Sequence, residues 1–409
     1  MNQAKFDEKK ARLDATIALT EPDRVPFSPK VGHFYCEGYG VHIYEAMKDL
    51  RTVFPGVLQF LKDYDPDLVW SATTYSIDAL DALGSLSLRR PGPGFGIPLD
   101  ASFQFIDQTN MLDDEFDEFL RDPTHFTLTK LLPRRYSNLQ PFSKLFFGDL
   151  YERSTIQNLS VFAQDDVRKA LYAMVRAGEA ASKMGADTAE IGRIIAEEGY
   201  PAIGASFYTP FDIYADFVRG LIQATMDVIE RPEATLEVVN RIADLYIDHN
   251  IAAAAARGDK YAFMPLHAGV DEFMSVANYE KFYWPGLKRI MMALIDHGIT
   301  PYVFCEGKYN TRLEVLSDVP KGKVVYLFEE VDEKRTKDVL GKVACIGGNL
   351  PSALLAFGTK QQVIDETKRL IDIFAPGGGF IMDCSITLDN ATHENMRAWQ
   401  ETTLEYGVY

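Results

Sequence analysis

The segment Tyr302-Val303-Phe304-Cys305-Glu306-Gly307 is an uninterrupted apolar run that ends in a thiol, a carboxylate and a glycine. β-Branched and aromatic residues favour a strand, and a run without polar alternation indicates burial on both faces, as in a parallel sheet. Taking a carboxylate out of water costs several kcal/mol unless it meets a metal, a cation or a proton. We therefore expect Glu306, at the end of this strand, to have a partner or a chemical role.

Similar segments recur along the chain and alternate with helical patterns. The predicted strands are 25–29, 68–72, 202–207, 261–267, 299–306, 324–329, 343–347 and 379–383. Alternation of this kind requires parallel strands with right-handed crossovers, and eight such strands close a (β/α)8 barrel. The alternative is an open doubly wound sheet, which is disfavoured because no glycine-rich phosphate loop follows the first predicted strand.

We predict one domain over residues 1–409, with an N-terminal helical extension at 5–20 and an insertion at about 77–160. Strand and helix alternation breaks down in the insertion, which contains the loop RRPGPGFGIPLD (89–100) and the acidic helix DDEFDEFLRDP (113–123). Its Phe and Leu content indicates that it packs on the rest of the protein, as a lid over the barrel mouth.

Composition excludes several classes of protein. The formal charge is −17 over 409 residues, and no basic cluster is present, so nucleic-acid binding is not expected. The first residues lack the apolar core of a signal peptide and no apolar run reaches membrane-spanning length, so we predict a cytoplasmic protein that does not bind membranes. The four cysteines are predicted to be free thiols, not a disulfide framework: Cys36, Cys305, Cys345 and Cys384.

Reactive groups of a barrel gather where the strands end, at the carboxyl side. The strand ends here supply the following residues: Lys30, His33, 73–75, Tyr208, His267, Cys305, Glu306, Glu329, Glu330, Asn349, Asp383 and Cys384. Strand parity predicts that Phe304 and Glu306 face the barrel interior while Cys305 faces the helices. Asn349 follows two glycines that would let a ligand approach the backbone. Aromatic residues near strand ends, including Tyr35, Tyr75 and Tyr208, suit a planar substrate.

One imidazole, one carboxylate and one thiolate could hold zinc with a fourth position open for substrate. His267, Glu306 and Cys384 are the candidates. The alternative for each is structural: His267 bonds a backbone carbonyl, Glu306 pairs with Lys308 or Arg312, and Cys384 is a small buried apolar residue. The sequence leaves both readings open.

Six ordered pieces of the chain carry a family resemblance. They are LTEPDRVPF (19–27), LHAGVDEFMSVANYEKFYWPGLKRI (266–290), FCEGKYNTRLEVL (304–316), CIGGNLPSALLAFGTKQQV (345–363), PGGGFIMDC (376–384) and HENMRAW (393–399). In order and spacing they resemble the uroporphyrinogen decarboxylase superfamily, in particular its methyltransferase branch, which includes corrinoid and coenzyme M methyltransferases and relatives in O-demethylase systems. The resemblance implies a (β/α)8 barrel with its site at the mouth, in agreement with the strand count.

The resemblance also implies site residues. In zinc methyltransferases of this family, a His-x-Cys on one strand and a Cys near the last strand hold the metal. Phe304 stands at the His position, Glu306 at the first Cys, and Cys384 at or next to the second. Porphyrinogen decarboxylases carry an early arginine pair, which the segment from Lys30 to Tyr35 lacks, so decarboxylation of a porphyrinogen is not expected.

The leading hypothesis is a methyltransferase that moves a methyl group from a small methylated molecule, such as a methoxylated aromatic compound, to a corrinoid on a partner protein or to a thiol. Glu306, His267 and Tyr208 would be catalytic, while His33, Tyr35, Tyr75, Phe304 and Asn349 would bind substrate. The first alternative is a cofactor-free decarboxylase or lyase acting on a small carboxylic acid, with Glu306 as the acid. The second is a non-catalytic binding protein. The sequence does not decide whether the chain forms a homodimer.

Overall fold

The computed structural model of the chain describes residues 2–70, 72–148 and 155–409. The main sheet is parallel, with six strands in the order of the sequence. Its strands are β3 (Ala205–Ser206), β4 (Tyr261–Leu266), β5 (Thr300–Lys308), β6 (Val325–Glu330), β7 (Cys345–Gly347) and β8 (Phe380–Ile381). A separate antiparallel pair is formed by β1 (Leu88–Arg89) and β2 (Gln104–Phe105).

Two further segments close this sheet into a ring. Phe27 forms a parallel bridge with Met382, beside β8, and Val69 forms one with Ala202, beside β3. Between these two segments the amide of Asp67 donates to the carbonyl oxygen of Phe27 at 2.7 Å. The six strands and the two bridged segments therefore make a ring of eight, as in a (β/α)8 barrel. The predicted fold class is confirmed, although the first two predicted strands pair only through isolated bridges and residue 71 of the second lies outside the described residues.

Side chains along the strands alternate between two apolar cores. Tyr302 and Phe304 of β5 belong to the core inside the barrel, whereas Val303 and Cys305 belong to the core between the strands and the outer helices. This is the predicted parity. It places Glu306, the next residue in the interior phase, at the mouth, which is the end of the barrel where the strands terminate.

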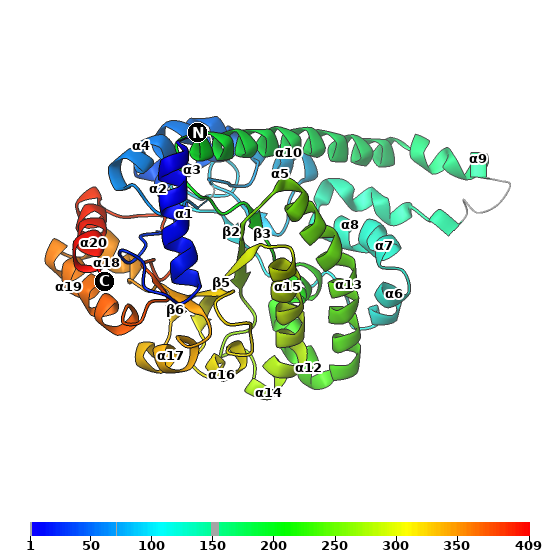
Figure 1. Cartoon of the computed structure of the whole chain (residues 1–409). Helices are drawn as coiled ribbons and strands as arrows, with labels where there is room; N and C mark the ends of the chain where they lie inside the picture. The colour runs from blue at the N-terminus through cyan, green and yellow to red at the C-terminus, as the bar shows by residue number, and fades with distance from the viewer. Residues whose placement is uncertain (1, 71, 149–154) are drawn as a thin grey trace.

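Helices surround the barrel (Figure 1). Those that follow the strands of the main sheet are α11 (Pro210–Asp212), α12 (Leu221–Glu230), α13 (Pro232–Arg257), α14 (Val276–Asn278), α15 (Trp284–Asp296), α16 (Leu313–Leu316), α17 (Glu333–Leu340), α18 (Ser352–Phe357), α19 (Lys360–Phe374) and α20 (His393–Tyr406). Two π-helical segments, η6 (Ile213–Arg219) and η7 (Tyr279–Tyr283), adjoin them. The helical pattern of residues 212–230 predicts one continuous helix, which is wrong, because Gly220 interrupts it with φ +90°.

The first part of the chain contributes α1 (Gln3–Ile17), α2 (Phe34–Glu37), α3 (Ile43–Lys48), η1 (Leu50–Val53), α4 (Phe54–Tyr64) and α5 (Ile77–Leu83). The middle part contributes α6 (Phe116–Arg121), α7 (Pro123–Phe126), η2 (Thr127–Leu131), α8 (Leu132–Arg135), η3 (Ser137–Lys144), α9 (Thr155–Asn158), η5 (Leu159–Ala163) and the 33-residue α10 (Asp165–Glu197). Figure 1 shows α10 running along the top of the barrel and α9 projecting beyond it. The insertion at 77–160 stays a prediction, and residues 149–154 of it lie outside the described residues.

The end of the barrel opposite the mouth is closed by α1. Leu13 and Ile17 of this helix join the interior core together with Leu68, Tyr261 and Tyr302. Beside them the fully buried carboxylate of Asp67 accepts hydrogen bonds from Arg12 at 2.6 Å and from Arg24 at 2.7 Å. It also accepts from the amide of Phe27 at 2.8 Å. This carboxylate therefore joins α1 to both of the bridged segments that complete the ring.

In the part of the chain that the structure describes, no helix combines the length and the apolar character needed to cross a lipid bilayer.

Candidate active site

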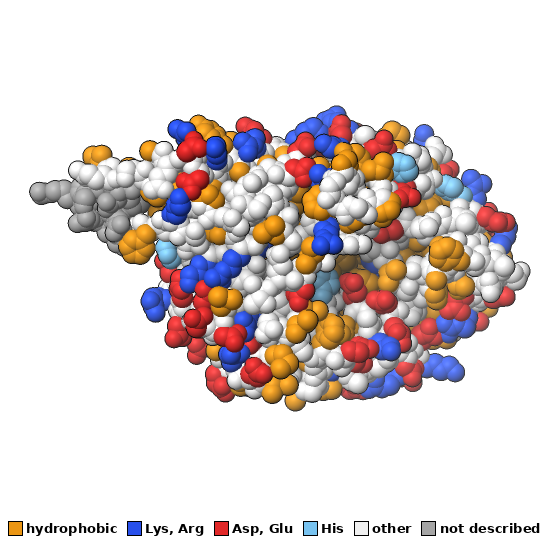
Figure 2. All heavy atoms as spheres, turned by 180° about the vertical axis from the view of Figure 1, so that it is seen from behind, with side chains coloured by type: hydrophobic (Ala, Val, Ile, Leu, Met, Phe, Trp, Pro, Cys, Tyr) orange, Lys and Arg blue, Asp and Glu red, His pale blue; other side chains and the backbone are white. Residues whose placement is uncertain are grey.

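The centre of the site is a pair of side chains on neighbouring strands. His267 directly follows β4, and its Nε2 lies 3.5 Å from Oε2 of Glu306, near the end of β5. The Glu306 side chain is half exposed, and that of His267 is about one-third exposed. Sequence reasoning predicted that these two residues would meet, and the structure brings them together at the mouth. Figure 2 shows a hollow near the middle of the face seen from behind, with a histidine and carboxylate side chains at its edge.

The other ring nitrogen of His267 is held by a carboxylate. Nδ1 donates to Oδ2 of Asp216 at 2.7 Å. Burial alone would lower the pKa of His267, but the hydrogen bond to Asp216 and the surrounding carboxylates raise this pKa to about 9. The imidazole is therefore protonated at neutral pH, and Nε2–H is the donor that it presents at the mouth.

Asp212 is a second carboxylate near the imidazole of His267, and it bonds the backbone of the next residue. Its carboxylate is fully buried and accepts from the amide of Ala268 at 2.9 Å and from the hydroxyl of Tyr283 at 2.6 Å. Burial raises the pKa of Asp212 to about 6, against the opposing charge of His267. The Asp212 carboxylate thereby fixes the backbone that carries His267.

Asp212 and Asp216 were not predicted from the sequence. They come from PFDIYADF (210–217), which follows Tyr208 at the end of β3. Two aspartates four residues apart lie on one face of a helix. Two aspartates at this spacing, close after a strand end, are the sequence pattern from which these two site residues could have been predicted.

Glu306 is desolvated despite its open position. Burial raises the pKa of Glu306, the charge of His267 opposes this effect, and the carboxylate of Glu329 adds to it. Glu329 is itself anchored, because its Oε2 accepts from the amide of Gly307 at 2.7 Å. The alternative pairing of Glu306 with Lys308 or Arg312 is not found: Lys308 lies near Glu272 and Glu330, and Arg312 lies near Asp271.

Aromatic side chains form a continuous wall beside this pair. The ring of Tyr208 lies 6.0 Å from that of His267 and 5.3 Å from that of Phe217, measured between centroids. Tyr75 and Tyr208 are close enough for each to affect the pKa of the other. We call the residues His33, Tyr75, Phe103, Phe105, Tyr208 and Phe217 the aromatic wall.

The remainder of the aromatic wall comes from the first part of the chain. Phe103 packs edge-on against Tyr75 at 4.8 Å and against His33 at 5.8 Å, and Phe105 lies 6.0 Å from Tyr75. Phe103 and Phe105 belong to the segment predicted as an insertion, and sequence reasoning did not single them out. Tyr75 and Phe105 are 36% and 59% exposed, so this part of the wall is open to a ligand.

Two residues predicted to bind substrate lie deeper in the protein. Tyr35 is 1% exposed and donates its hydroxyl to the carbonyl of Trp70 at 3.0 Å. Phe304 is 3% exposed and packs in the interior core, with the ammonium of Lys30 3.7 Å from its ring centre. The prediction of a substrate contact was based on nearness to a strand end, and burial shows that both residues are packing residues beneath the mouth.

The end of β8 holds a buried ion pair. Oδ1 of Asp383 accepts from the amide of Lys30 at 2.6 Å, and Oδ2 lies 3.8 Å from the Lys30 ammonium. Burial raises the pKa of Asp383. The Oδ2 atom has no hydrogen-bond partner among the described residues, and the same holds for the buried Oδ1 of Asn349 and Nε1 of Trp70. These atoms are hydrogen-bond acceptors and a donor that a ligand at the mouth could use.

The predicted zinc ligands do not converge. The Cys384 thiol is fully buried and contacts the carbonyl of Ile386 at 3.0 Å, and burial raises the pKa of this thiol well above its usual range. Over residues 2–70, 72–148 and 155–409, no group of three or more His, Cys, Asp and Glu side chains is arranged to hold a metal ion. Glu306, His267 and Cys384 are thus not assembled as a zinc site, and Cys384 follows its alternative reading as a buried apolar residue.

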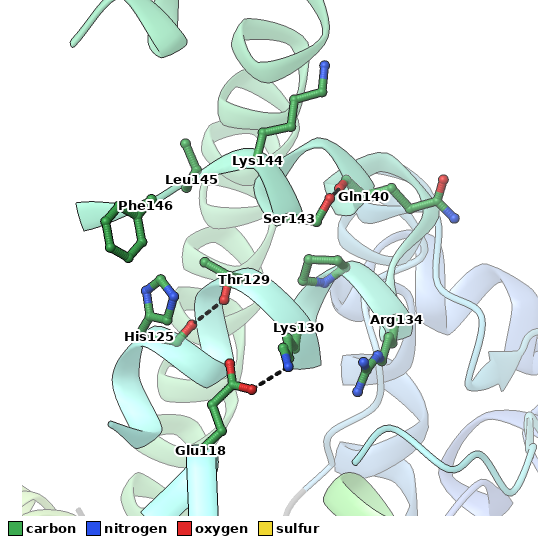
Figure 3. Close-up of a pocket in the computed structure, with 11 residues that line it drawn as sticks. Glu118, His125, Thr129, Lys130, Arg134, Gln140, Ser143, Lys144, Leu145 and Phe146 are labelled. Atoms are coloured by element: carbon green, nitrogen blue, oxygen red, sulfur yellow. Dashed lines mark hydrogen bonds and ion pairs between the residues drawn. The ribbon is translucent and has the colours of Figure 1, made fainter. Parts of the chain in front are cut away.

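A cavity of about 630 Å³ lies elsewhere, among α6, α7, η2 and η3 (Figure 3). Its cations are already paired: Lys130 with Glu115 and Glu118, and Lys144 with Asp166. The hydrogen bonds and ion pairs of His267 and Glu306 among the described residues involve none of its lining residues. The strand ends, where a protonated imidazole meets a carboxylate beside the aromatic wall, therefore form the candidate active site.

Comparison with known proteins gives two similarities. No protein-family model matches the sequence. The chain is 28% identical over 155 residues to a uroporphyrinogen decarboxylase from Syntrophotalea carbinolica, a match that covers 38% of this chain and 43% of that protein. The chain thus spans less than half the length of this relative.

The second similarity is to a solved structure, a methyltransferase from Methanosarcina mazei. The TM-score is 0.62 at 14% identity, over 97% of this chain and 98% of that one, and it shows a shared fold. A uroporphyrinogen decarboxylase and a methyltransferase are the two kinds of enzyme that the sequence resemblance named. The resemblance is therefore confirmed.

Proposed function

We propose that the chain is a methyltransferase that takes a methyl group from a small methoxylated aromatic compound and passes it to a thiol or to a corrinoid on a partner protein. The similarity to a solved methyltransferase structure supports methyl transfer in general, and the aromatic wall supports a planar donor. The observation that carries the proposal is the protonated imidazole of His267, which Asp216 orients and which presents Nε2–H at the mouth.

The step requires an acid. A nucleophile attacks the methyl carbon, the bond between methyl carbon and oxygen breaks, and its electron pair stays on the aryl oxygen. His267 donates the Nε2 proton to that oxygen, so that a neutral phenol leaves. The acceptor, a thiolate or a reduced corrinoid, supplies the nucleophile. Glu306 lies beside Nε2 and positions the imidazolium, and Tyr208 packs against the imidazole ring.

Product analysis tests this proposal. The purified protein is incubated with 4-methoxyphenol and either 2-mercaptoethanol or chemically reduced cobalamin, and hydroquinone and the methylated acceptor are quantified. We expect both products in equal amounts. Absence of both from 4-methoxyphenol and from a panel of other methoxybenzenes would contradict methyl transfer.

Glu306 supports a second candidate function. Burial raises the pKa of this carboxyl, as a general acid of a decarboxylase or lyase requires. The same protein incubated with small aromatic and aliphatic acids would then release carbon dioxide without an acceptor. Carbon dioxide release with no methylated product would favour this second function.

The pH dependence of methyl transfer follows from the pKa of His267. Because the imidazole acts as an acid, the rate should fall as pH rises through about 9. Asp216→Asn removes the negative charge that keeps His267 protonated, so the pH at which the rate falls should be lower than in the unmodified protein. If that pH is lower by one unit, the rate at higher pH values is lower by about tenfold. Rates measured from pH 6 to 10 check this, and an unchanged limb in Asp216→Asn would contradict the role of Asp216.

The hydrogen bond between His267 and Asp216 also makes the stability of the protein depend on pH. The folded-state pKa of His267, about 9, lies above the ordinary value of 6.5. Its contribution to the free energy of unfolding is therefore complete below pH 6.5 and is lost as pH rises through about 9.

A further inference from the structure

Arg135 is a half-buried arginine that has no carboxylate partner in the part of the chain that the structure describes. It is the last residue of α8, and its Nε is buried with no hydrogen-bond partner among the described residues. The described carboxylates form no ion pair with it, although the chain carries 59 acidic residues against 42 basic ones. A buried N–H without an acceptor is costly, and the rest of this half-buried guanidinium has donors left over, so an anion from outside the described residues would complete its bonds.

The neighbouring arginine shows the contrast. Arg134 makes two parallel bonds to Glu115, at 2.6 and 2.8 Å, and also donates to the carbonyl of Asn110. The two arginines lie in the same helix and are both half-buried, yet among the described residues only Arg134 has carboxylate and carbonyl partners for its side chain.

Arg135 belongs to the candidate active site by position. Its guanidinium lies 5.2 Å from the ring centre of Phe217, a member of the aromatic wall. Phe217 contacts Tyr208, and Tyr208 contacts His267. The charge of Arg135 also lowers the pKa of Tyr75, against the larger effect of burial, so the cation is near that ring too. Contacts through Phe217 and Tyr208 thus connect the acidic NH of His267 with a guanidinium that has no carboxylate partner among the described residues.

The backbone holds Arg135 in place. Its carbonyl accepts from the amide of Leu86 at 3.0 Å, and the next residue, Tyr136, forms an antiparallel bridge with Ser85. The ring of Tyr136 also lies 5.5 Å from the guanidinium. A guanidinium held over an aromatic ring on a paired backbone is pre-organised for a planar anion.

We propose that Arg135 binds the carboxylate of the methyl donor, so that the substrate is a methoxylated aromatic acid lying along the aromatic wall between Arg135 and His267. The inference rests on the proposed function and names its substrate class. The planar fork of a guanidinium matches a carboxylate with two parallel bonds. The ring of the acid would pack on Tyr75, Tyr208 and Phe217, and its methoxy oxygen would meet Nε2 of His267.

Binding and turnover of a matched pair of compounds test this inference. The compounds are 4-methoxybenzoate and methoxybenzene, which differ only in the carboxylate. The proteins are the unmodified chain, Arg135→Met, and Arg121→Met as the control, because Arg121 is an exposed arginine that also lacks a carboxylate partner in the described part of the chain. Dissociation constants from calorimetry and rates of demethylation are both measured, together with the melting temperature of each protein.

We expect the unmodified chain and Arg121→Met to bind 4-methoxybenzoate about 10- to 100-fold more tightly than methoxybenzene. In Arg135→Met this preference should disappear while the affinity for methoxybenzene stays within about twofold. Loss of a selective preference, at an unchanged melting temperature, is not the result of a merely structural role.

Two other outcomes separate this inference from the proposed function. If the unmodified chain binds both compounds equally, or if the preference survives in Arg135→Met, the carboxylate site is wrong even when methyl transfer is observed. If neither compound is demethylated but benzoate itself binds in an Arg135-dependent way, the anion site stands and the proposed methyl transfer fails.

Discussion

Replacing His267 with glutamine should lower the rate of methyl transfer by about 10²- to 10⁴-fold, the range that a positioned general acid contributes. Glutamine keeps a donor of similar reach but carries no ionisable proton. The leaving oxygen would then depart as an unprotonated phenolate. Single-turnover measurement of phenol release at pH 7 checks the expectation, because it isolates the chemical step.

His249 provides the matched control. It is an exposed histidine on α13, and His249→Gln should react at the unmodified rate. Donor binding should be nearly unchanged in His267→Gln, since the proton is needed when the bond breaks. If His267→Gln retained more than one-third of the unmodified rate, and if its rate still fell at the same alkaline pH, another group would have to be the acid.

The largest expected effect on stability is at Asp67. Substituting Asp67 with alanine should reduce the free energy of unfolding by about 3–5 kcal/mol, because it removes the buried acceptor shared by two arginines, although Arg12 keeps its bonds to Asp23 and Glu8. Arg12 is 5% exposed and would lose its innermost bond to Asp67, and Arg24 would lose both of its bonds to this carboxylate. The amide of Phe27 would lose its acceptor as well.

Urea unfolding followed by circular dichroism measures this loss. Asp248→Ala is the control, since the Asp248 side chain is 83% exposed and only meets Arg289 at 4.0 Å. An exposed pair of this kind contributes at most about 1 kcal/mol. A change below about 1 kcal/mol in Asp67→Ala would show that the ring does not depend on this carboxylate.

The arrangement of strands was predictable because it depends on local pattern. Apolar runs, turn residues and period-2 alternation predicted the ring of eight and placed Phe304 inside and Cys305 outside. They also predicted that His267 and Glu306 would share the mouth, since neighbouring parallel strands end at the same side. These are properties that the order of residues along one strand determines.

The rest of the site depends on segments that the strand pattern does not describe. Asp212 and Asp216 lie in short helical turns after β3, and Phe103 and Arg135 lie in the stretch between the second bridged segment and α10. Their contacts arise from tertiary packing over long separations. Cys384 and Tyr35 were predicted to belong to the site, but both are buried. Nearness to a strand end does not reveal whether a side chain points toward the mouth or into the core.

The ring has a consequence for the order in which this protein can acquire its structure. Strands β3 to β8 each pair with the next one made, so this arc can assemble as the polypeptide leaves the ribosome. The Phe27–Met382 bridge joins residues that are far apart in the sequence, and it must wait until Met382 has been synthesised. Until then the segment around Phe27 lacks its neighbour in the ring, and an unpaired edge of this kind exposes the nascent chain to aggregation.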